Sequence, residues 1–384
     1  AAIEFTNTTG NDYVLGGSGK ITGPAVVSKN GSGKTTLTNT NTYAGNTSIN
    51  AGILSIATTG ALPGWNVNSR YPIASGATLA VQNAITDGDV ATMLATTGNF
   101  GAGAIIGFDT EAGDRAYASN LGGAIGVANV GPNILTLSGT NSHTGNTLVA
   151  AGTLKAGSST AFTGTGPLTM RASTAFDLGA SDASFTTISA GDLSNSITAG
   201  SAGTGTSTLT LTSGGANFLG FISDGSTRKV AVKCSANNSN NVPNNSDNTY
   251  SGGLTLLGAI APATSGTRLL PFSGFTTVDP ETGLVTSGPY GTGPIRIGEA
   301  STDKVQVYFQ AAGRTIANNI IVNSASGTDT AGTTPTVFGC NRAANQFGLV
   351  GLFNISIGLL FLLQPAKLGA AWVNFFSDVP AAVG

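Results

Sequence analysis

Residues 31–54, GSGKTTLTNTNTYAGNTSINAGIL, hold the pattern that decides the fold of this chain. Residues 131–154, GPNILTLSGTNSHTGNTLVAAGTL, repeat it at an offset of 100 without a gap, and 11 of the 24 positions are identical. A third, more divergent copy is DNTYSGGLTLLGAI at residues 247–260. Repetition of this kind indicates an architecture in which one supersecondary unit is stacked on the next.

The repeated positions combine apolar residues, which alternate as in short strands, with Asn, Gly and aromatic residues at fixed places. Asn and Gly tolerate left-handed backbone angles, so we expect the glycines at positive-φ corners. Stacked coils would then pair strand on strand. The sequence predicts an all-β parallel β-solenoid (β-helix), expected to be right-handed, with irregular loop insertions and about 15–19 coils of roughly 20–25 residues. The structural repeat positions are Leu37, Asn41, Tyr43, Gly45 and Gly52, then Leu137, Asn141, His143, Gly145 and Gly152, then Asn248, Tyr250 and Gly252.

Residues 28–37, SKNGSGKTTL, have the look of a phosphate-binding loop, but two features exclude one. The motif G-x-x-x-x-G-K-[ST] needs a glycine where this chain has Ser28, and it needs a helix afterwards. The residues after Lys34 and Thr35 are rich in Thr, Asn and Gly, which are poor helix formers. The second copy has Ile134 in place of Lys34, so we interpret the segment as the lead-in strand of the repeat.

Composition argues against several functional classes. Charged residues make up 9% of the chain and the formal net charge is -2, whereas about 25% charged residues is typical of soluble domains. No nucleic-acid-binding surface is therefore expected. The charge-poor profile is typical of extracellular β-proteins, and the first residues, AAIEFTNTTG, read as a mature N-terminus. We predict an extracellular or cell-surface location after signal-peptide removal.

The two long copies, residues 31–54 and 131–154, resemble the autotransporter-associated β-strand repeat, also called the passenger-associated transport repeat. Residues 218–225 (FLGFISDG) with 247–253 (DNTYSGG) look like the same repeat carrying an insertion, and residues 175–197 are similar to inter-repeat segments of that family. The resemblance implies a β-helical passenger that is exported and then displayed or released. It leaves open whether a C-terminal translocator barrel was removed.

The end of the chain, residues 347–384, is predicted to be a terminal region distinct from the solenoid of residues 1–346. Residues 347–363, FGLVGLFNISIGLLFLL, carry no formal charge, and we interpret them as final coils or a subunit contact, with a membrane segment as the less favoured alternative. An apolar surface at the end of a solenoid is expected to be covered by another protein surface. Head-to-tail contacts between subunits form filaments when they do not close into a ring. The predicted assembly residues are Phe353, Ile355, Leu359, Phe361, Trp372 and Phe375.

Few residues are candidates for metal or redox chemistry. Asp109, Glu111 and Asp114 are closely spaced on a Gly-containing segment and are weak candidates for calcium ligands, with solvated turns as the default interpretation. Cys234 and Cys340 are compatible with one disulfide or with two buried free thiols. We expect no cofactor and no zinc site.

His143 is the only histidine, and its repeat partners are Tyr43 and Tyr250. A position that accepts either kind of aromatic ring is expected to be structural rather than catalytic, so no catalytic residue is predicted. The favoured hypothesis is a secreted, non-enzymatic structural protein, a subunit of an extracellular fibre or surface layer that assembles with itself through its solenoid ends.

Two alternatives belong to other classes. An autotransporter-type passenger could act as an adhesin, with residues 84–130 and 261–290 as binding loops and a cell-surface or matrix polysaccharide as partner. A polysaccharide-acting enzyme would instead use Asp109 or Asp114 as catalytic carboxylates.

Overall fold

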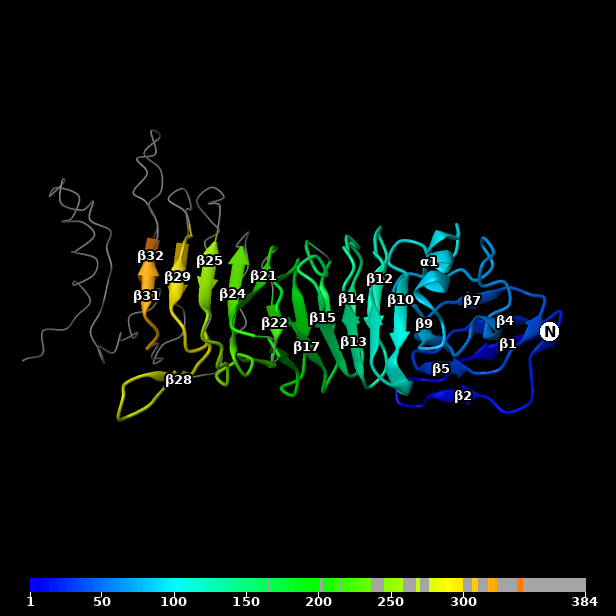
Figure 1. The fold of residues 1–384 in the computed structure, drawn as a ribbon, viewed down its shortest axis with the longest axis horizontal. Helices are drawn as coiled ribbons and strands as arrows, with labels where there is room; N and C mark the ends of the chain where they lie inside the picture. The colour runs from blue at the N-terminus through cyan, green and yellow to red at the C-terminus, as the bar shows by residue number, and fades with distance from the viewer. Residues whose placement is uncertain are drawn as a thin grey trace, which may run out of the picture.

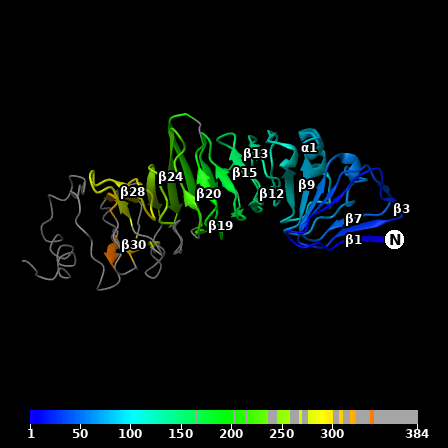
Figure 2. The same ribbon diagram turned by 90° about the horizontal axis from the view of Figure 1, so that it is seen from below.

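The computed structural model is an elongated rod of stacked β-coils (Figure 1, Figure 2), and it confirms the all-β parallel β-solenoid. Its described residues form about 12 turns, fewer than the roughly 15–19 coils expected for the whole chain. The predicted terminal region, residues 347–384 with all of its assembly residues, lies outside the described part of the chain. The structure describes residues 1–164, 166–200, 203–213, 216–235, 245–257, 267–269, 276–299, 306–309, 317–322 and 337–340.

Parallel strand pairs join neighbouring coils along four main sheets. The N-terminal sheet contains β1 (Ala2–Phe5), β4 (Val26–Lys29) and β7 (Thr47–Ile49). The long sheet contains, in order, β2 (Tyr13–Leu15), β5 (Lys34–Leu37), β8 (Ile53–Ile56), β9 (Thr78–Gln82), β10 (Ile105–Asp109), β12 (Gly126–Asn129), β14 (Thr147–Val149), β16 (Leu168–Met170), β19 (Ile188–Ala190) and β22 (Ala216–Phe218). The middle sheet contains β11 (Arg115–Tyr117), β13 (Ile134–Leu137), β15 (Thr153–Ala156), β17 (Ala175–Asp177), β20 (Ser196–Thr198) and β23 (Phe221–Ile222). The distal sheet contains β18 (Ala183–Phe185), β21 (Gly205–Leu211), β24 (Arg228–Ser235), β25 (Gly253–Leu257), β29 (Ile295–Ile297) and β31 (Ile320–Val322).

Smaller elements complete the rod. The helix α1 (Asp87–Ala95) begins with a capping box between Thr86 and Asp89, in which each side chain accepts a hydrogen bond from the other residue's backbone N–H. Within the described residues, no helix is long and apolar enough to cross a membrane. The remaining elements are β3 (Thr22–Gly23) paired with β6 (Thr42–Tyr43), the sheet of β26 (Thr267–Leu269), β30 (Gln306–Phe309) and β32 (Val337–Cys340), the antiparallel hairpin of β27 (Thr277–Val278) and β28 (Val285–Ser287), and the 3-10 turns η1 (Thr59–Ala61) and η2 (Thr110–Ala112).

Side chains that point into the coils form a core that continues from coil to coil. Leu135 and Leu137 of β13 stack on Leu154 and Ala156 of β15 in strict register, and all four are buried. Burial of each leucine contributes about 1.5–3 kcal/mol. The alternation of apolar and polar residues in the repeat therefore sets which face of each strand enters the core.

The offset of 100 residues between the two long copies corresponds to four turns plus one face of the coil. Along the long sheet, Thr36 pairs with Ser55, Ser55 with Ala80, Ala80 with Gly107, and Gly107 with Ala128, which makes four steps. Thr136 is the residue of the second copy that is equivalent to Thr36. It follows Ala128 by eight positions and lies in β13 of the middle sheet. The second copy is thus rotated by one face, because the turns through β9 and β10 take 25 and 27 residues instead of the 19 between β5 and β8.

The rod bends where these longer turns occur. In Figure 1 the strands β2 and β5 run along the picture, whereas β10 and the strands after it run across it. The outward column of the long sheet at this place consists of Ser55, Ala80, Gly107 and Ala128, and its side chains are buried although they lie outside the core. A Cβ on Gly107 would lie 2.7 Å from Thr78 Cγ2. Small outward side chains therefore let the sheet curve with a concave outer face.

This geometry corrects one expectation. Residues 84–130 are not one long loop outside the coils, because they contribute β10, β11 and β12 to the stack. Even α1 buries Val90 and Met93 in the core. The second predicted loop, residues 261–290, is described only in part. Its described residues 276–290 include the hairpin of β27 and β28, which projects from the rod in Figure 1.

Candidate functional site

The repeat asparagines join three successive coils. The side chain of Asn41 accepts a hydrogen bond from the backbone N–H of Ile21 at 2.9 Å and donates one to the carbonyl of Ala61 at 2.8 Å. Asn141 and Asn248 make the same two bonds to the coils on either side, at 2.7–3.0 Å. All three are buried. These amides satisfy backbone groups of the corners that no strand ladder reaches, which is a structural role.

The aromatic position of the repeat is a buried slot with one hydrogen-bond partner. In the first copy the hydroxyl of Tyr43 lies 2.7 Å from Thr47 Oγ1. In the second copy Nε2 of His143 lies 2.9 Å from Thr147 Oγ1, four residues later in both cases. Within the described part of the chain Nδ1 of His143 has no hydrogen-bond partner, and burial lowers the pKa of this histidine to about 4. The ring is therefore neutral at pH 7 and makes contacts expected of a core residue.

The third copy keeps the ring but loses the partner. Tyr250 is fully buried, and the residue four positions later is Leu254 instead of threonine. Its hydroxyl has no hydrogen-bond partner among the described residues, and burial raises the pKa of this tyrosine well above the ordinary value. The slot thus tolerates a tyrosine, a histidine or an unpaired hydroxyl, which a catalytic position would not.

The repeat glycines serve two different purposes, and only one was predicted. Gly52 and Gly152 have φ of +66° and +59°, as expected for left-handed corners. Gly45, Gly145 and Gly252 do not have positive φ, so the expectation of a left-handed corner is wrong for them. A Cβ on Gly145 would lie 2.4 Å from a backbone carbonyl carbon of the preceding coil. These glycines are required because the neighbouring coil passes too close for any side chain.

The predicted calcium candidates do not converge on a common site. Asp109 is fully buried, accepts a hydrogen bond from Ser55 Oγ at 2.6 Å and lies 3.5 Å from Lys34 Nζ. Glu111 lies 3.4 Å from the same lysine nitrogen. Asp114 instead accepts a hydrogen bond from a backbone N–H of β13 at 2.9 Å. Among the described residues no group of three or more His, Cys, Asp or Glu side chains could hold a metal ion. Lys34, the residue of the supposed phosphate loop, thus bridges the concave bend.

Cys234 is a buried free thiol, and burial raises its pKa to about 12. A thiol so rarely ionised is a poor nucleophile. Of the two alternatives left open for the cysteines, the structure shows the free thiol at this position.

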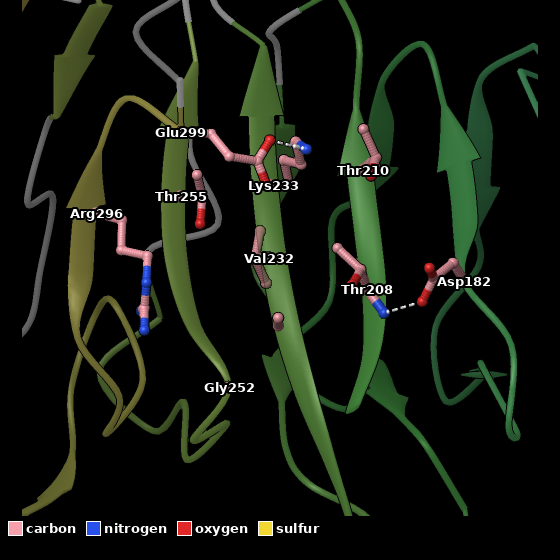
Figure 3. Close-up of a pocket in the computed structure, with 10 residues that line it drawn as sticks. Asp182, Thr208, Thr210, Val232, Lys233, Gly252, Thr255, Arg296 and Glu299 are labelled. Atoms are coloured by element: carbon pink, nitrogen blue, oxygen red, sulfur yellow. Dashed lines mark hydrogen bonds and ion pairs between the residues drawn. The ribbon is translucent and has the colours of Figure 1, made fainter. Parts of the chain in front are cut away.

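A groove of 410 Å³ lies on the outer face of the distal sheet, and no motif in the sequence indicated it. Figure 3 shows Thr210, Lys233, Thr255 and Arg296 on the successive strands β21, β24, β25 and β29. These four residues are paired in register, so their side chains emerge in one row. The residues come from four separate segments of the chain, so neither their spacing nor a local motif could have identified the groove.

A model of the passenger-associated-transport-repeat family matches residues 27–56 and 130–156. The chain carries two passenger-associated transport repeats. No curated protein and no solved structure matches the chain. The first match spans β4 to β8, and the second ends with β15, so each repeat covers the asparagine corner, the aromatic slot and both kinds of glycine.

The chain is a β-solenoid that carries two repeats of this family, and the repeat family points to a secreted or surface protein. Residues that the two matched segments share, such as Asn41 and Asn141, thus hold one coil to the next.

Proposed function

We propose that this protein is a secreted or surface-displayed passenger with a structural, non-enzymatic role. The observation that supports this most directly is the use of the polar repeat residues inside the stack. Asn41, Asn141 and Asn248 bond to backbone groups of the coils on either side, and His143 occupies a slot that tyrosine fills elsewhere. The most deeply buried acid of the bend, Asp109, is held by a serine and a lysine.

The proposed lack of enzymatic activity is open to a direct assay. We expect the purified chain to release no new reducing ends from neutral or acidic polysaccharides. Release of reducing ends that disappears in both Asp109→Asn and Asp114→Asn would overturn the proposal in favour of a glycan-cleaving enzyme. The pair of substitutions matters, because loss of activity in the first variant alone could reflect a weakened bend.

We further propose that the rods assemble head to tail into an extracellular fibre or surface layer. The support comes from the uncharged, apolar composition of residues 347–363 and from the rod shape of the described part. Electron microscopy of detergent-free native material is expected to show filaments with a regular axial repeat. Single short rods at all concentrations would contradict assembly and leave a monomeric passenger.

An adhesin is the second candidate, and the groove on the distal sheet favours it. Its outward row of hydroxyl and cationic side chains offers hydrogen-bond donors and acceptors to a glycan. Cells displaying the chain are expected to bind glycan-coated surfaces, and adhesion equal to that of cells without the chain would exclude this role.

A further inference from the structure

The groove on the distal sheet has a floor of alternating hydroxyl and cationic side chains. Thr210, Lys233, Thr255 and Arg296 follow one another across β21, β24, β25 and β29, with Thr208 one row away on β21. Adjacent parallel strands are about 4.8 Å apart. The row therefore offers polar groups at regular intervals to a ligand that lies along the rod axis.

Three of the four charged side chains in the groove have polar partners within the protein. The carboxylate of Asp182 accepts a hydrogen bond from the backbone N–H of Thr208 at 2.7 Å. Lys233 forms an ion pair with Glu299, which Figure 3 shows at the edge of the groove. The ion pair neutralises Lys233, whereas Asp182 is held in place by a neutral backbone N–H and keeps its negative charge.

Arg296 is the exception. Among the described residues its guanidinium has no hydrogen-bond acceptor and no carboxylate partner, yet its side chain is partly buried in the groove. A guanidinium presents five N–H donors in a planar fork that matches a carboxylate or sulfate group in a bidentate arrangement. An unpaired fork of this kind, on a floor of threonine hydroxyls, is a site for an oxyanion that also carries hydroxyl groups.

We propose that this groove binds an acidic polysaccharide, with Arg296 holding a carboxylate of the glycan and Thr208, Thr210 and Thr255 bonding to sugar hydroxyls. Threonine hydroxyls both donate and accept hydrogen bonds, as sugar hydroxyls do. The groove is open and polar and has no apolar pocket for a peptide side chain. A nucleic-acid backbone would need several cations to neutralise its phosphates. The described lining residues of the groove supply only Lys233 and Arg296, of which Lys233 is already paired with Glu299. The inference rests on the proposed function, because only an exposed rod would meet such a glycan.

The test is titration calorimetry of the full chain with an oligomer of galacturonic acid at low and high salt. Arg296→Gln should weaken binding about 10- to 100-fold, as expected for loss of a charge-assisted bidentate contact. Arg296→Lys keeps the charge without the fork and should be intermediate. Arg171→Gln removes an exposed arginine outside the groove and is the matched control, with binding unchanged. Both glutamine variants should melt at the temperature of the parent, because neither guanidinium is bonded to a described residue.

Several results would overturn the proposal. One is that Arg296→Gln binds the acidic oligomer as tightly as the parent does. Another is that the chain binds neutral dextran as tightly as the acidic oligomer, or binds duplex DNA in preference to it. The last is that the acidic oligomer does not bind at all. If the chain is displayed on the cell surface as a rod and yet fails every glycan test, the groove proposal alone fails. If the chain is not exported, the proposed function fails whatever the groove binds.

Discussion

Replacement of His143 by tyrosine should remove a pH dependence of stability that this histidine introduces. The ring is fully buried, and burial lowers its pKa from 6.5 to about 4. Between these values the unfolded chain binds a proton that the folded chain does not bind, so stability falls as the pH falls. The stability that the neutral His143 ring contributes is fully present above pH 6.5. It decreases as the pH falls further and is lost below about pH 4.

The magnitude follows from the two pKa values. Between pH 8 and pH 4.5 the linkage relation gives a loss of about 2.5 kcal/mol in the free energy of unfolding. His143→Tyr should lack this loss, because Tyr43 shows that the slot accepts a tyrosine whose hydroxyl bonds to the threonine four residues later, at 2.7 Å against 2.9 Å for the histidine. The variant should therefore be stable at pH 7 and more stable than the parent at pH 4.5.

The assay is urea unfolding followed by circular dichroism from pH 4.5 to 8 for parent and variant. Subtraction of the two curves cancels the carboxylates, which titrate in both proteins. A stability difference that stays constant across this pH range would refute the reasoning, since it would mean that the histidine is protonated equally in the folded and unfolded chains.

Three further predictions concern the same repeats, each read from the free energy of unfolding. Tyr43→Phe should cost about 1 kcal/mol because it removes a buried hydrogen bond. Tyr250→Phe should cost nothing or stabilise, since the buried hydroxyl of Tyr250 has no partner among the described residues; equal costs would contradict the assigned contacts. Asn141→Ala should cost about 2–4 kcal/mol, because it leaves buried groups of two neighbouring coils unsatisfied, and a cost below 0.5 kcal/mol (roughly the spread of surface substitutions) would show that the coils do not need it. Gly145→Ala should prevent stable stacking, whereas Gly191→Ala, with open space around its Cβ position, should be neutral; the reverse order would be incompatible with the close approach of the coils.

The coil could be predicted from the repeat, because the residues that determine its strands and corners lie close together in the sequence. The spacing of Leu, Asn and Gly in residues 31–54 defines strands and corners, and these are found where expected. The role of Gly145 was predicted incorrectly, since its requirement arises from the backbone of the coil beneath it. That backbone lies 20 residues earlier, and the sequence does not show how closely it passes.

The bend and the groove could not be predicted for a related reason. Two turns of 25 and 27 residues shift the second repeat by one face, but an ungapped offset of 100 conceals them. Asp109 looked like a solvated turn residue, and it is buried because the concave sheet brings Lys34 to it. The groove depends on the register of four strands, which is a property of the stack as a whole.

The central claim, that the repeats build one continuous stack and serve structure, is tested most directly by cryo-electron microscopy of the purified chain. The account predicts a bent rod of parallel coils in which the second passenger-associated transport repeat lies four turns along from the first and one face around. A globular particle, or a rod in which both repeats lie on the same face, would contradict it.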